Sequence, residues 1–436
     1  MPHSFHPSDH THAPIQASTV MNMAFSPARI AARRLAHIRM ASTSAVSGLR
    51  SVLIVGAART PVGSFQGSLA KVPATDLGIT AFKGALQQAN VQPDQVEDVY
   101  LGSVLQANLG QAPARQVVLG SGCPPSTEAT TINKVCASGM KAVMLAAQNI
   151  QTGERDLMVA GGMESMSMAP FYYPRTPGTF GHLQAQDAIV KDGLTDVYGG
   201  YAMGICAEDT ATKMDISRQA QDEYCLESYR RAAEAWKNGA FANEIVPVII
   251  KDRRKGEIII SEDEEYKNIK LDKVAGLKPV FKKDGTVTAA NASTLNDGAS
   301  AIVLASQEKV DELGLKPLAK IIAFADAACA PIEFPIAPSY AIPLALKKAG
   351  LTKDDIAKWE INEAFSAVAI GNQKKLDIDP TKLNVNGGAV ALGHALGSSG
   401  SRIIVTLTHL LKKGEYGCAA VCNGGGGASA IIIQRV

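Results

Sequence analysis

The second half of this chain repeats the first. Residues 91–100 (V-Q-P-D-Q-V-E-D-V-Y) align without a gap with residues 351–360 (L-T-K-D-D-I-A-K-W-E), at a shift of 260 residues. Each stretch follows a helix-like segment and leads into a β-rich run, which favours duplication over the alternative of a chance match. Strands that alternate with helices predict a layered α/β fold with a parallel-rich core, and duplicated halves of this kind normally pack around a pseudo-twofold axis.

A second correspondence places two reactive residues opposite each other. The helix-like segment 140–150 leads through G-E-R-D-L-M-V-A-G-G, and the segment 401–411 leads through G-E-Y-G-C-A-A-V-C-N-G-G. Cys136 and His394 stand just before these segments. Because loops at strand ends of both halves converge at the axis, we expect Cys136 and His394 to meet there.

Cys136 has the sequence setting of a nucleophile. It stands between a β-leaning run that ends at Val135 and a helix-like segment. Unpaired N–H groups at a helix N-terminus favour the thiolate, which is the reactive form of cysteine. A buried structural cysteine is the alternative for any single cysteine. The catalytic interpretation gains support from His394, which lies opposite in the Gly-rich turn G-G-A-V-A-L-G-H-A-L-G-S-S-G.

The C-terminal half adds two candidates, Asn362 in N-E-A-F and Cys422 in C-N-G-G-G-G-A-S. Backbone N–H groups of Asn423-Gly424 can form an oxyanion hole. Two cysteines and one histidine suit acyl transfer through a thioester, in which one thiolate takes the acyl group and the second thiol moves a proton at carbon.

Composition excludes several other classes of protein. The net charge is +2, and it is slightly negative beyond the Arg-rich first fifty residues, so no nucleic-acid surface is expected. Seven cysteines without a C-x-x-C argue against a disulfide framework or a zinc site, and no P-loop motif occurs. The chain contains no run of eighteen apolar residues, so no membrane span is expected.

Residues 1–49 have the composition of a mitochondrial transit peptide. The first fifty residues carry five arginines, no lysine and one acid, and from Met21 onward the arginines and serines have helical, amphipathic spacing. We therefore expect import into the mitochondrial matrix. A disordered tail without an address is the alternative, and translation from Met40 would remove most of the signal and leave the protein in the cytoplasm.

The chain divides into four parts on this interpretation. After the leader 1–49, residues 50–168 and 291–317 form the N-terminal half, 169–290 an insertion, and 318–436 the C-terminal half. The insertion has a charged stretch, 251–283, whose lysines and arginines form either a solvated face or a binding surface for a phosphate-bearing ligand.

Six motifs then occur in register: N-K-V-C-A-S-G-M-K, A-G-G-M-E-S-M-S, A-N-A-S-T-L-N-D-G-A, N-E-A-F, G-H-x-x-G-x-S-G and C-N-G-G-G-G-A-S. With them the chain resembles the thiolase family from about Ser51 to Val436, and within it the mitochondrial acetyl-CoA acetyltransferase branch. The resemblance implies two βαβαβαββ halves in five αβαβα layers, an inserted loop domain for CoA binding and tetramerisation, and a homotetramer. The implied reaction is reversible condensation of two acetyl-CoA to acetoacetyl-CoA and CoA.

The resemblance also implies a role for each site residue. Cys136 is acetylated, His394 activates it, and Cys422 removes the α-proton of the second acetyl-CoA. A water held by Asn362 acts with His394 in one oxyanion hole, and the N–H groups of Cys136 and Gly424 form the other. The implied CoA contacts are Tyr229, Asn268, Ile269, Lys270, Lys273 and Ser293. The implied K⁺ ligands are Tyr229 and the carbonyls of Ala289, Ala290, Ala292 and Val390.

Two positions depart from the family pattern. Ala395 replaces the usual Pro after the histidine, which predicts a less rigid loop, and Ala202 replaces a pocket histidine, which bears on substrate preference. Phe334-Pro335 match a pair linked with 2-methylacetoacetyl-CoA. The alternatives are a broad-chain 3-ketoacyl-CoA thiolase of β-oxidation and an inactive CoA-binding protein. A condensing synthase of the same fold would lack a second cysteine at position 422.

Overall fold

The computed structural model describes residues 48–175 and 180–436, so the predicted leader lies almost wholly outside the described residues. Over these ranges ten strands form one sheet in the order β12-β13-β14-β11-β1-β10-β5-β3-β4, with β2 beside β10. The strands of the first half are β1 (Val52–Arg59), β2 (Gly63–Ser64), β3 (Asp98–Gly102), β4 (Glu128–Ile132), β5 (Leu157–Ser165) and β10 (Asn296–Ser306). Those of the second half are β11 (Ala319–Ala328), β12 (Ile356–Ile361), β13 (Tyr416–Asn423) and β14 (Gly427–Arg435).

The two halves have the same strand order and meet at equivalent edges. The first half runs β4-β3-β5-β10-β1 and the second runs β12-β13-β14-β11. At the junction β1 pairs antiparallel with β11, Leu53 opposite Lys320. In the second half the expected third strand is reduced to a single bridge between Trp359 and Leu383. The second half therefore lacks one full strand of the βαβαβαββ repeat.

The repeat found in the sequence is visible in local geometry. The helices α2 (Ala74–Ala89) and α8 (Pro338–Ala349) both end in a left-handed residue, Asn90 and Gly350 respectively. Each is followed by a short 3₁₀ turn with a reciprocal capping box. Duplication therefore extends to the caps that end the helices.

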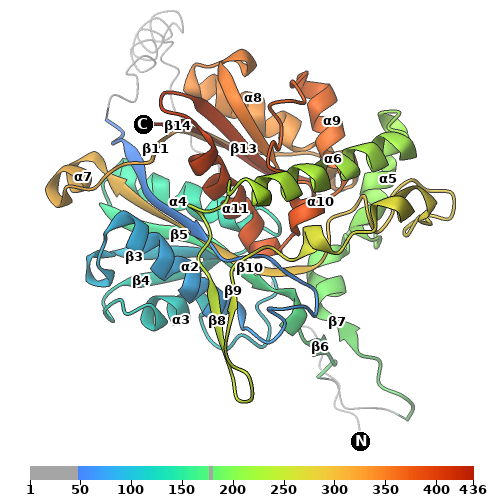
Figure 1. Cartoon of the computed structure of the whole chain (residues 1–436), viewed down its shortest axis with the longest axis horizontal. Helices are drawn as coiled ribbons and strands as arrows, with labels where there is room; N and C mark the ends of the chain where they lie inside the picture. The colour runs from blue at the N-terminus through green and yellow to red at the C-terminus, as the bar shows by residue number, and fades with distance from the viewer. Residues whose placement is uncertain (1–47, 176–179) are drawn as a thin grey trace, which may run out of the picture. The chain divides into compact units, whose positions relative to one another are not determined.

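Helices and half-sheets alternate in layers across the core (Figure 1). One buried cluster lies between the half-sheets, around α4 (Ser138–Thr152) and α11 (Leu396–Leu410). A second joins α2 and α3 (Pro113–Gly120) to the outer face of the first half-sheet. A third joins α8 to the outer face of the second, with α9 (Ser366–Leu376) beside α8. The predicted α/β/α/β/α order follows, with α4 and α11 as the middle layer.

A long segment between β5 and β10 carries the remaining elements. These are β6 (Phe171–Tyr172), β7 (Gln186–Asp187), a π-helical turn Ile189–Leu194, α5 (Met203–Lys213), α6 (Arg218–Lys237), β8 (Val248–Asp252) and β9 (Gly256–Ile260). Two short helices lie outside it, α7 (Gln307–Leu313) and α10 (Ala389–Leu392). The guanidinium of Arg59, at the end of β1, is buried and paired with Glu244 and Asp263, which fastens the inserted segment to the body.

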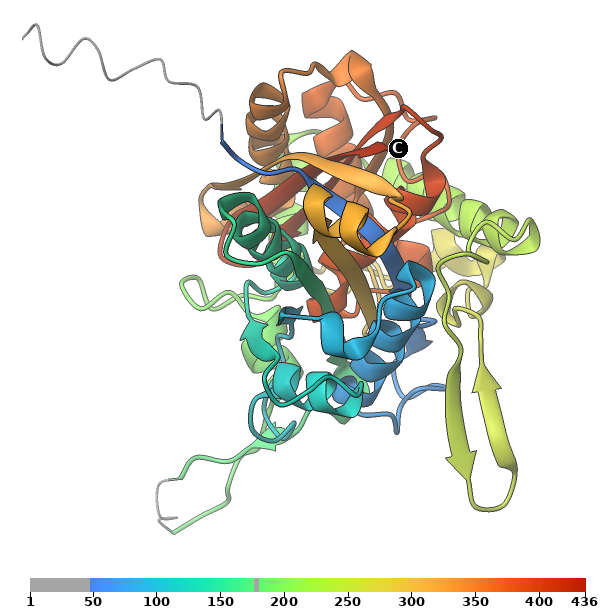
Figure 2. The ribbon, with the colours of Figure 1, turned by 90° about the vertical axis from the view of Figure 1, so that its left-hand side faces the viewer.

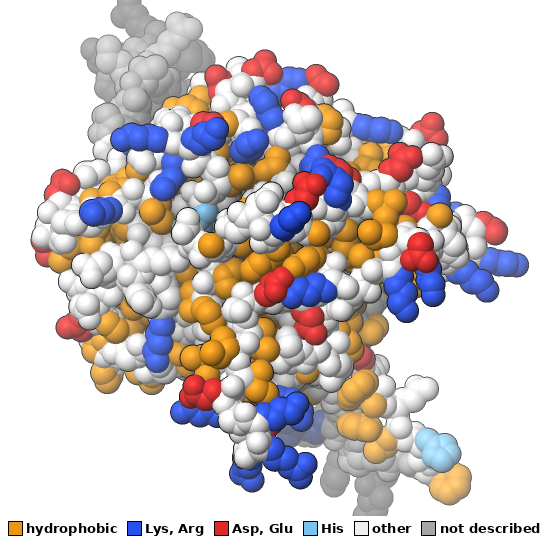
Figure 3. Space-filling model, in the orientation of Figure 1, with side chains coloured by type: hydrophobic (Ala, Val, Ile, Leu, Met, Phe, Trp, Pro, Cys, Tyr) orange, Lys and Arg blue, Asp and Glu red, His pale blue; other side chains and the backbone are white. Residues whose placement is uncertain are grey.

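The charged stretch of the insertion separates into two regions. Arg253, Arg254 and Lys255 are exposed at the tip of the β8–β9 hairpin, which projects from the body (Figure 2). Basic side chains gather at this tip in the space-filling view (Figure 3). Lys270 and Lys273 lie further along the chain, a few residues after Asn268. Over the described residues, no helix combines the length and the apolar character needed to cross a bilayer.

Candidate active site

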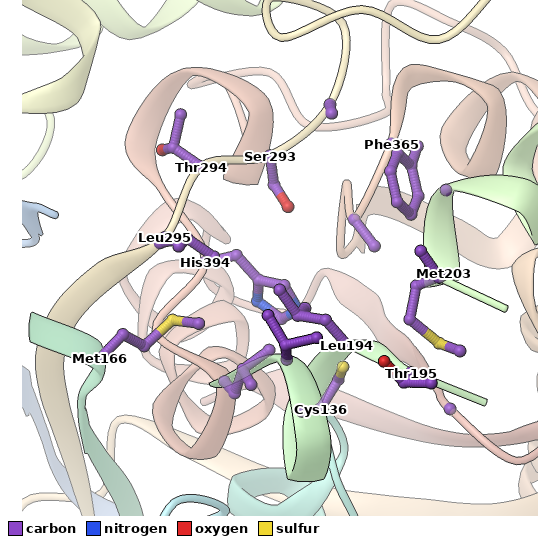
Figure 4. Close-up of a pocket in the computed structure, with 18 of the residues that line it drawn as sticks. Cys136, Met166, Leu194, Thr195, Met203, Ser293, Thr294, Leu295, Phe365 and His394 are labelled. Carbon is purple, nitrogen blue, oxygen red and sulfur yellow. The ribbon is translucent and has the colours of Figure 1, made fainter. Parts of the chain in front are cut away.

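A cavity of about 280 Å³ opens at the N-terminal ends of α4 and α11. Its lining is mostly apolar, but it contains Cys136 and His394, one from each half. Figure 4 shows the Cys136 sulfur and the His394 ring in the middle of this cavity, with Met203 and Phe365 toward one side and Met166 toward the other. Cys136 and His394 therefore come together in one cavity, as expected from the sequence.

Cys136 stands two residues before α4, where the sequence places it, but burial dominates its chemistry. Burial raises the pKa of its thiol to about 12, while the backbone N–H of Gly424 donates to the sulfur and opposes the rise. The expectation that the helix N-terminus would favour a resting thiolate is wrong for this reason. The sulfur is a thiol at neutral pH and needs a base at the moment of reaction.

Val135, directly before Cys136, has a left-handed backbone with φ of 48°. This conformation is unusual for a β-branched residue and costs about 1–3 kcal/mol. Local hydrogen bonds hold it: the Val135 N–H donates to Asn133 Oδ1 at 2.9 Å, and its carbonyl accepts from the Ser138 N–H at 3.0 Å. The Ser138 hydroxyl also donates to that carbonyl. The thiol is thus presented by a strained turn.

His394 is held at both its backbone and its ring. Its N–H donates to Asn296 Oδ1 at 2.8 Å, and its Nδ1 lies 2.6 Å from the hydroxyl of Ser399. That hydroxyl donates to the carbonyl of Ala395 at 2.9 Å, so Nδ1 carries the proton and donates to Ser399. Burial lowers the pKa of His394 to about 3, and the Arg402 guanidinium adds to this. Nε2, which has no partner among the described residues, is therefore free to accept a proton.

Cys422 and Asn362 lie behind the cavity wall rather than on it. Cys422 is fully buried and packs with Met203, Phe334 and Phe365. Burial raises its pKa well above the usual value, and charge on Cys136 raises it further. Asn362 is also buried, and neither of its side-chain polar atoms has a hydrogen-bond partner within the described ranges. Gly424 lines the cavity directly.

A second cavity of about 470 Å³ continues from the first toward solvent. Both share Phe281, Ala292, Ser293, Thr294 and Leu295, and the outer one reaches Asn268. Of the predicted CoA contacts, Ser293 and Asn268 therefore line this passage, and Lys270 and Lys273 are exposed near it in sequence. Tyr229 and Ile269 belong to a buried cluster and line neither cavity.

The predicted K⁺ ligands lie close to the same passage. Tyr229, Ala290 and Val390 share one buried cluster, while Ala289 and Ala292 line the outer cavity. The carbonyls of Ala289 and Ala292 accept no hydrogen bond from the described chain, and that of Ala290 accepts one from the Cys225 thiol. Carbonyl oxygens that accept no hydrogen bond from the described chain suit a hard monovalent cation. No group of three or more His, Cys, Asp or Glu suited to a metal ion occurs in the described ranges.

Sequence reasoning missed most of the apolar lining. Leu194 and Thr195 come from the insertion, and Leu295 and Phe365 from loops beside the halves. No periodic pattern marks such side chains, because each comes from a separate loop. Two positions singled out in the sequence, Ala202 and Phe334, do line the cavity, whereas Pro335 is buried and does not line it.

Comparison with known proteins identifies the family to which this site belongs. Residues 52–308 match the thiolase N-terminal domain, and residues 315–435 match the thiolase C-terminal domain. The chain belongs to the thiolase family. Both the family and the fold class predicted from the sequence are thereby confirmed.

Relatives of this thiolase cover nearly its whole body. The acetyl-CoA acetyltransferase of Yarrowia lipolytica is 61% identical over 388 residues, which are 89% of this chain and 97% of the relative. The mitochondrial acetyl-CoA acetyltransferase of Bos taurus is 56% identical over 407 residues, 93% of this chain and 96% of that one. The Acat5 thiolase of Ascaris suum, solved in complex with coenzyme A, is 49% identical with a TM-score of 0.86, over 89% of this chain and all of the other.

We predict that Ala395→Pro stabilises this thiolase. Ala395 already has φ of −70°, within the range of proline, and His394 before it forms a β-bridge with Leu295, which suits a residue that precedes proline. The substitution should raise the free energy of unfolding by about 0.4–1 kcal/mol, because proline reduces the conformational entropy of the unfolded chain. Urea denaturation measures it, with Ala369→Pro in the interior of α9 as a destabilised control. A loss of stability in Ala395→Pro would contradict the backbone described for this loop.

Proposed function

We propose that this thiolase is an acetyl-CoA C-acetyltransferase that joins two acetyl-CoA into acetoacetyl-CoA and free CoA, and in reverse cleaves acetoacetyl-CoA with CoA. The observation that carries the proposal is the meeting of the Cys136 thiol and the His394 imidazole at one buried cavity, with the Cys422 thiol buried behind its wall against Met203, Phe334 and Phe365. The names of the relatives, at 56% and 61% identity, support the same activity.

The first half-reaction acetylates Cys136. His394 accepts the thiol proton at Nε2 while the sulfur attacks the thioester carbonyl, since both groups are neutral at rest. The N–H groups of Cys136 and Gly424 stabilise the developing oxyanion. CoA leaves as its thiol, taking the proton of Cys422, so that Cys422 becomes a thiolate while the proton from Cys136 stays on His394 Nε2.

The second half-reaction forms the carbon–carbon bond. Cys422 accepts the α-proton of the second acetyl-CoA, whose thioester oxygen is held by His394 Nε2 and by a water on Asn362. The unpartnered atoms of His394 and Asn362 support this assignment. The carbanion attacks the acetyl carbon, the bond to Cys136 breaks, and the Cys136 sulfur recovers its proton from His394 Nε2. A thiol suits this shuttle because its charged form is less costly to bury than that of a smaller, harder base.

Two cysteine variants should separate the half-reactions. Cys136→Ala should abolish acetyl-enzyme formation with labelled acetyl-CoA. Cys422→Ser should still be acetylated but fail to exchange the α-protons of acetyl-CoA with deuterated water, followed by NMR. Normal exchange in Cys422→Ser would remove Cys422 from the proposed role, while labelling of Cys136→Ala would identify another nucleophile.

The inner cavity favours short acyl groups over the alternative of a broad-chain thiolase. Its volume is about 280 Å³, and Leu194, Met203, Phe334 and Phe365 narrow it. Phe334 and Ala202 bear on whether a 2-methyl branch, as in 2-methylacetoacetyl-CoA, is accepted. An inactive CoA-binding protein is disfavoured because all three reactive side chains are present.

Bound K⁺ would be held by Tyr229 and the carbonyls of Ala289, Ala290, Ala292 and Val390, and it would supply positive charge that orders the loops around Ser293. CoA would lie along the outer cavity, past Ser293 and Asn268, with Lys270 and Lys273 available to its phosphates. Tyr229 lines neither cavity, so we assign it to K⁺ binding rather than to direct contact with CoA.

We predict that kcat/KM for thiolysis of acetoacetyl-CoA exceeds that for a ten-carbon 3-ketoacyl-CoA by about ten-fold or more, as a difference of about 1.4 kcal/mol gives. The assay follows loss of the ketoacyl-CoA in potassium buffer.

The same assay is repeated with tetramethylammonium in place of K⁺. Activity should fall when K⁺ is replaced. Comparable rates for both substrates would favour the broad-chain alternative, and indifference to the cation would remove the ion assignment.

We also propose a mitochondrial matrix location, supported by the leader composition and by mitochondrial relatives. A fluorescent reporter fused to the full chain should enter mitochondria, whereas a fusion that begins at Met40 should remain cytosolic. A full-length fusion that stays in the cytosol would contradict the proposal.

A homotetramer is proposed from the family resemblance. Exposed apolar side chains on the insertion support it: Phe171, Tyr173, Phe180, Leu183 and Tyr198. Light scattering of the purified chain gives its mass, and a monomer would contradict this assembly.

A further inference from the structure

A charged side chain joins the loop that carries Cys136 to the opposite half. Lys134, two residues before the nucleophile, extends its ammonium to the carboxylate of Asp326. The same ammonium lies 2.9 Å from the Ser429 hydroxyl and 3.3 Å from the Ala428 carbonyl. The Ser429 hydroxyl donates to Asp326 at 2.6 Å, which closes the network. We call Lys134, Asp326 and Ser429 the Lys134 clamp.

The partners of Lys134 belong to the strands that carry the rest of the site. Asp326 in β11 pairs with Ser429 in β14, and Ala428 pairs across β13–β14 with Cys422. The turn between β13 and β14 contains Gly424, whose N–H donates to the Cys136 sulfur. Lys134 is therefore anchored beside the second thiol and the N–H donor, although it comes from the other half of the chain.

The Lys134 clamp stabilises the strained turn at Val135, directly before Cys136. Val135, between Lys134 and Cys136, has the left-handed φ of 48°, which a β-branched residue leaves unless its surroundings fix it. The hydrogen bonds of Asn133 and Ser138 to this turn are all local to the N-terminal half. Lys134 adds the contact that fixes the turn relative to the C-terminal half.

Lys141 shows why the position of the contact matters. It pairs with the other oxygen of Asp326 at 2.7 Å, from within helix α4, and its side chain is about as exposed as that of Lys134, 25% against 24%. It contacts neither Ala428 nor Ser429 in the hydrogen bonds of the described chain. Partly exposed ion pairs contribute little to stability by themselves. The two lysines are thus matched in charge and partner but differ in what they anchor.

We propose that Lys134 and Asp326 are positioning residues for Cys136, which set the distance from its sulfur to His394, Cys422 and Gly424 by locking the Val135 turn onto β11 and β14. This inference rests on the proposed role of Cys136 as the nucleophile. Neither side chain touches the cavity, so both act through the backbone of the loop.

The test compares Lys134→Met with its matched control Lys141→Met in the full-length enzyme. Lys134→Met should lower kcat for acetoacetyl-CoA thiolysis at least ten-fold with KM changed less than three-fold, because substrate contacts remain. Lys141→Met should change kcat less than two-fold. Lys134→Arg, which keeps the cation and its reach, should recover most of the loss. Equal losses in both Met variants, or an unchanged kcat in Lys134→Met, would overturn the proposal.

A second measurement keeps the proposal separate from the substrate assignment. Iodoacetamide alkylation of Cys136, followed by mass spectrometry of its peptide, needs no acyl-CoA and can be read even if the proposed reaction is wrong. Its rate should change at least five-fold in Lys134→Met and less than two-fold in Lys141→Met. If Lys134→Met does not fold, Asp326→Asn, which removes only the charge, replaces it with the same criteria. Alkylation at the native rate in a folded clamp variant would refute the positioning role.

Discussion

The site depends on how closely the N-terminal ends of α4 and α11 approach each other and the strands around them. A Cβ added to Gly139 would lie 2.6 Å from the Ser401 hydroxyl, and one added to Gly162 would lie 1.9 Å from the Gly397 carbonyl. Only glycine permits these contacts, because protein interiors are close-packed. Cys136 and His394 each stand two residues before one of these helices, so the helix crossing itself brings a sulfur and an imidazole together.

The same crossing removes both groups from water, and this decides their resting state. A helix N-terminus stabilises a nearby anion by about 0.3–1 kcal/mol, which is less than one pKa unit. Burial raises the pKa of Cys136 from 9.0 to about 12, a larger effect in the opposite direction. A neutral pair avoids the cost of burying charge before substrate arrives. Charge then appears only when the N–H of Gly424 and the substrate can stabilise it.

The duplication made much of this arrangement predictable. Once residues 91–100 and 351–360 were aligned, the pairing of Cys136 with His394 followed from the symmetry of two α/β halves. The left-handed Val135 could not be foreseen, because a valine offers no local signal for positive φ. The contact of Lys134 with Asp326 joins residues 192 positions apart, and no periodicity reports such a pair. The inner lining escaped prediction for a related reason, since Leu194 and Thr195 belong to an insertion without a counterpart in the other half.

The two halves carry chemically different side chains at the ends of two corresponding strands. The carboxyl ends of β5 and β13 carry Glu164 and Cys422, both buried. The Glu164 carboxylate accepts backbone N–H groups of Val104, Leu105 and, across the interface, Gly397. Burial raises its pKa to about 7, yet the three N–H donors oppose the rise and keep it anchored to both halves. A carboxylate so engaged cannot also move a proton on substrate. Cys422 costs little to bury as a thiol and needs no such partners. One strand end can thus hold the halves together while the other remains available for chemistry.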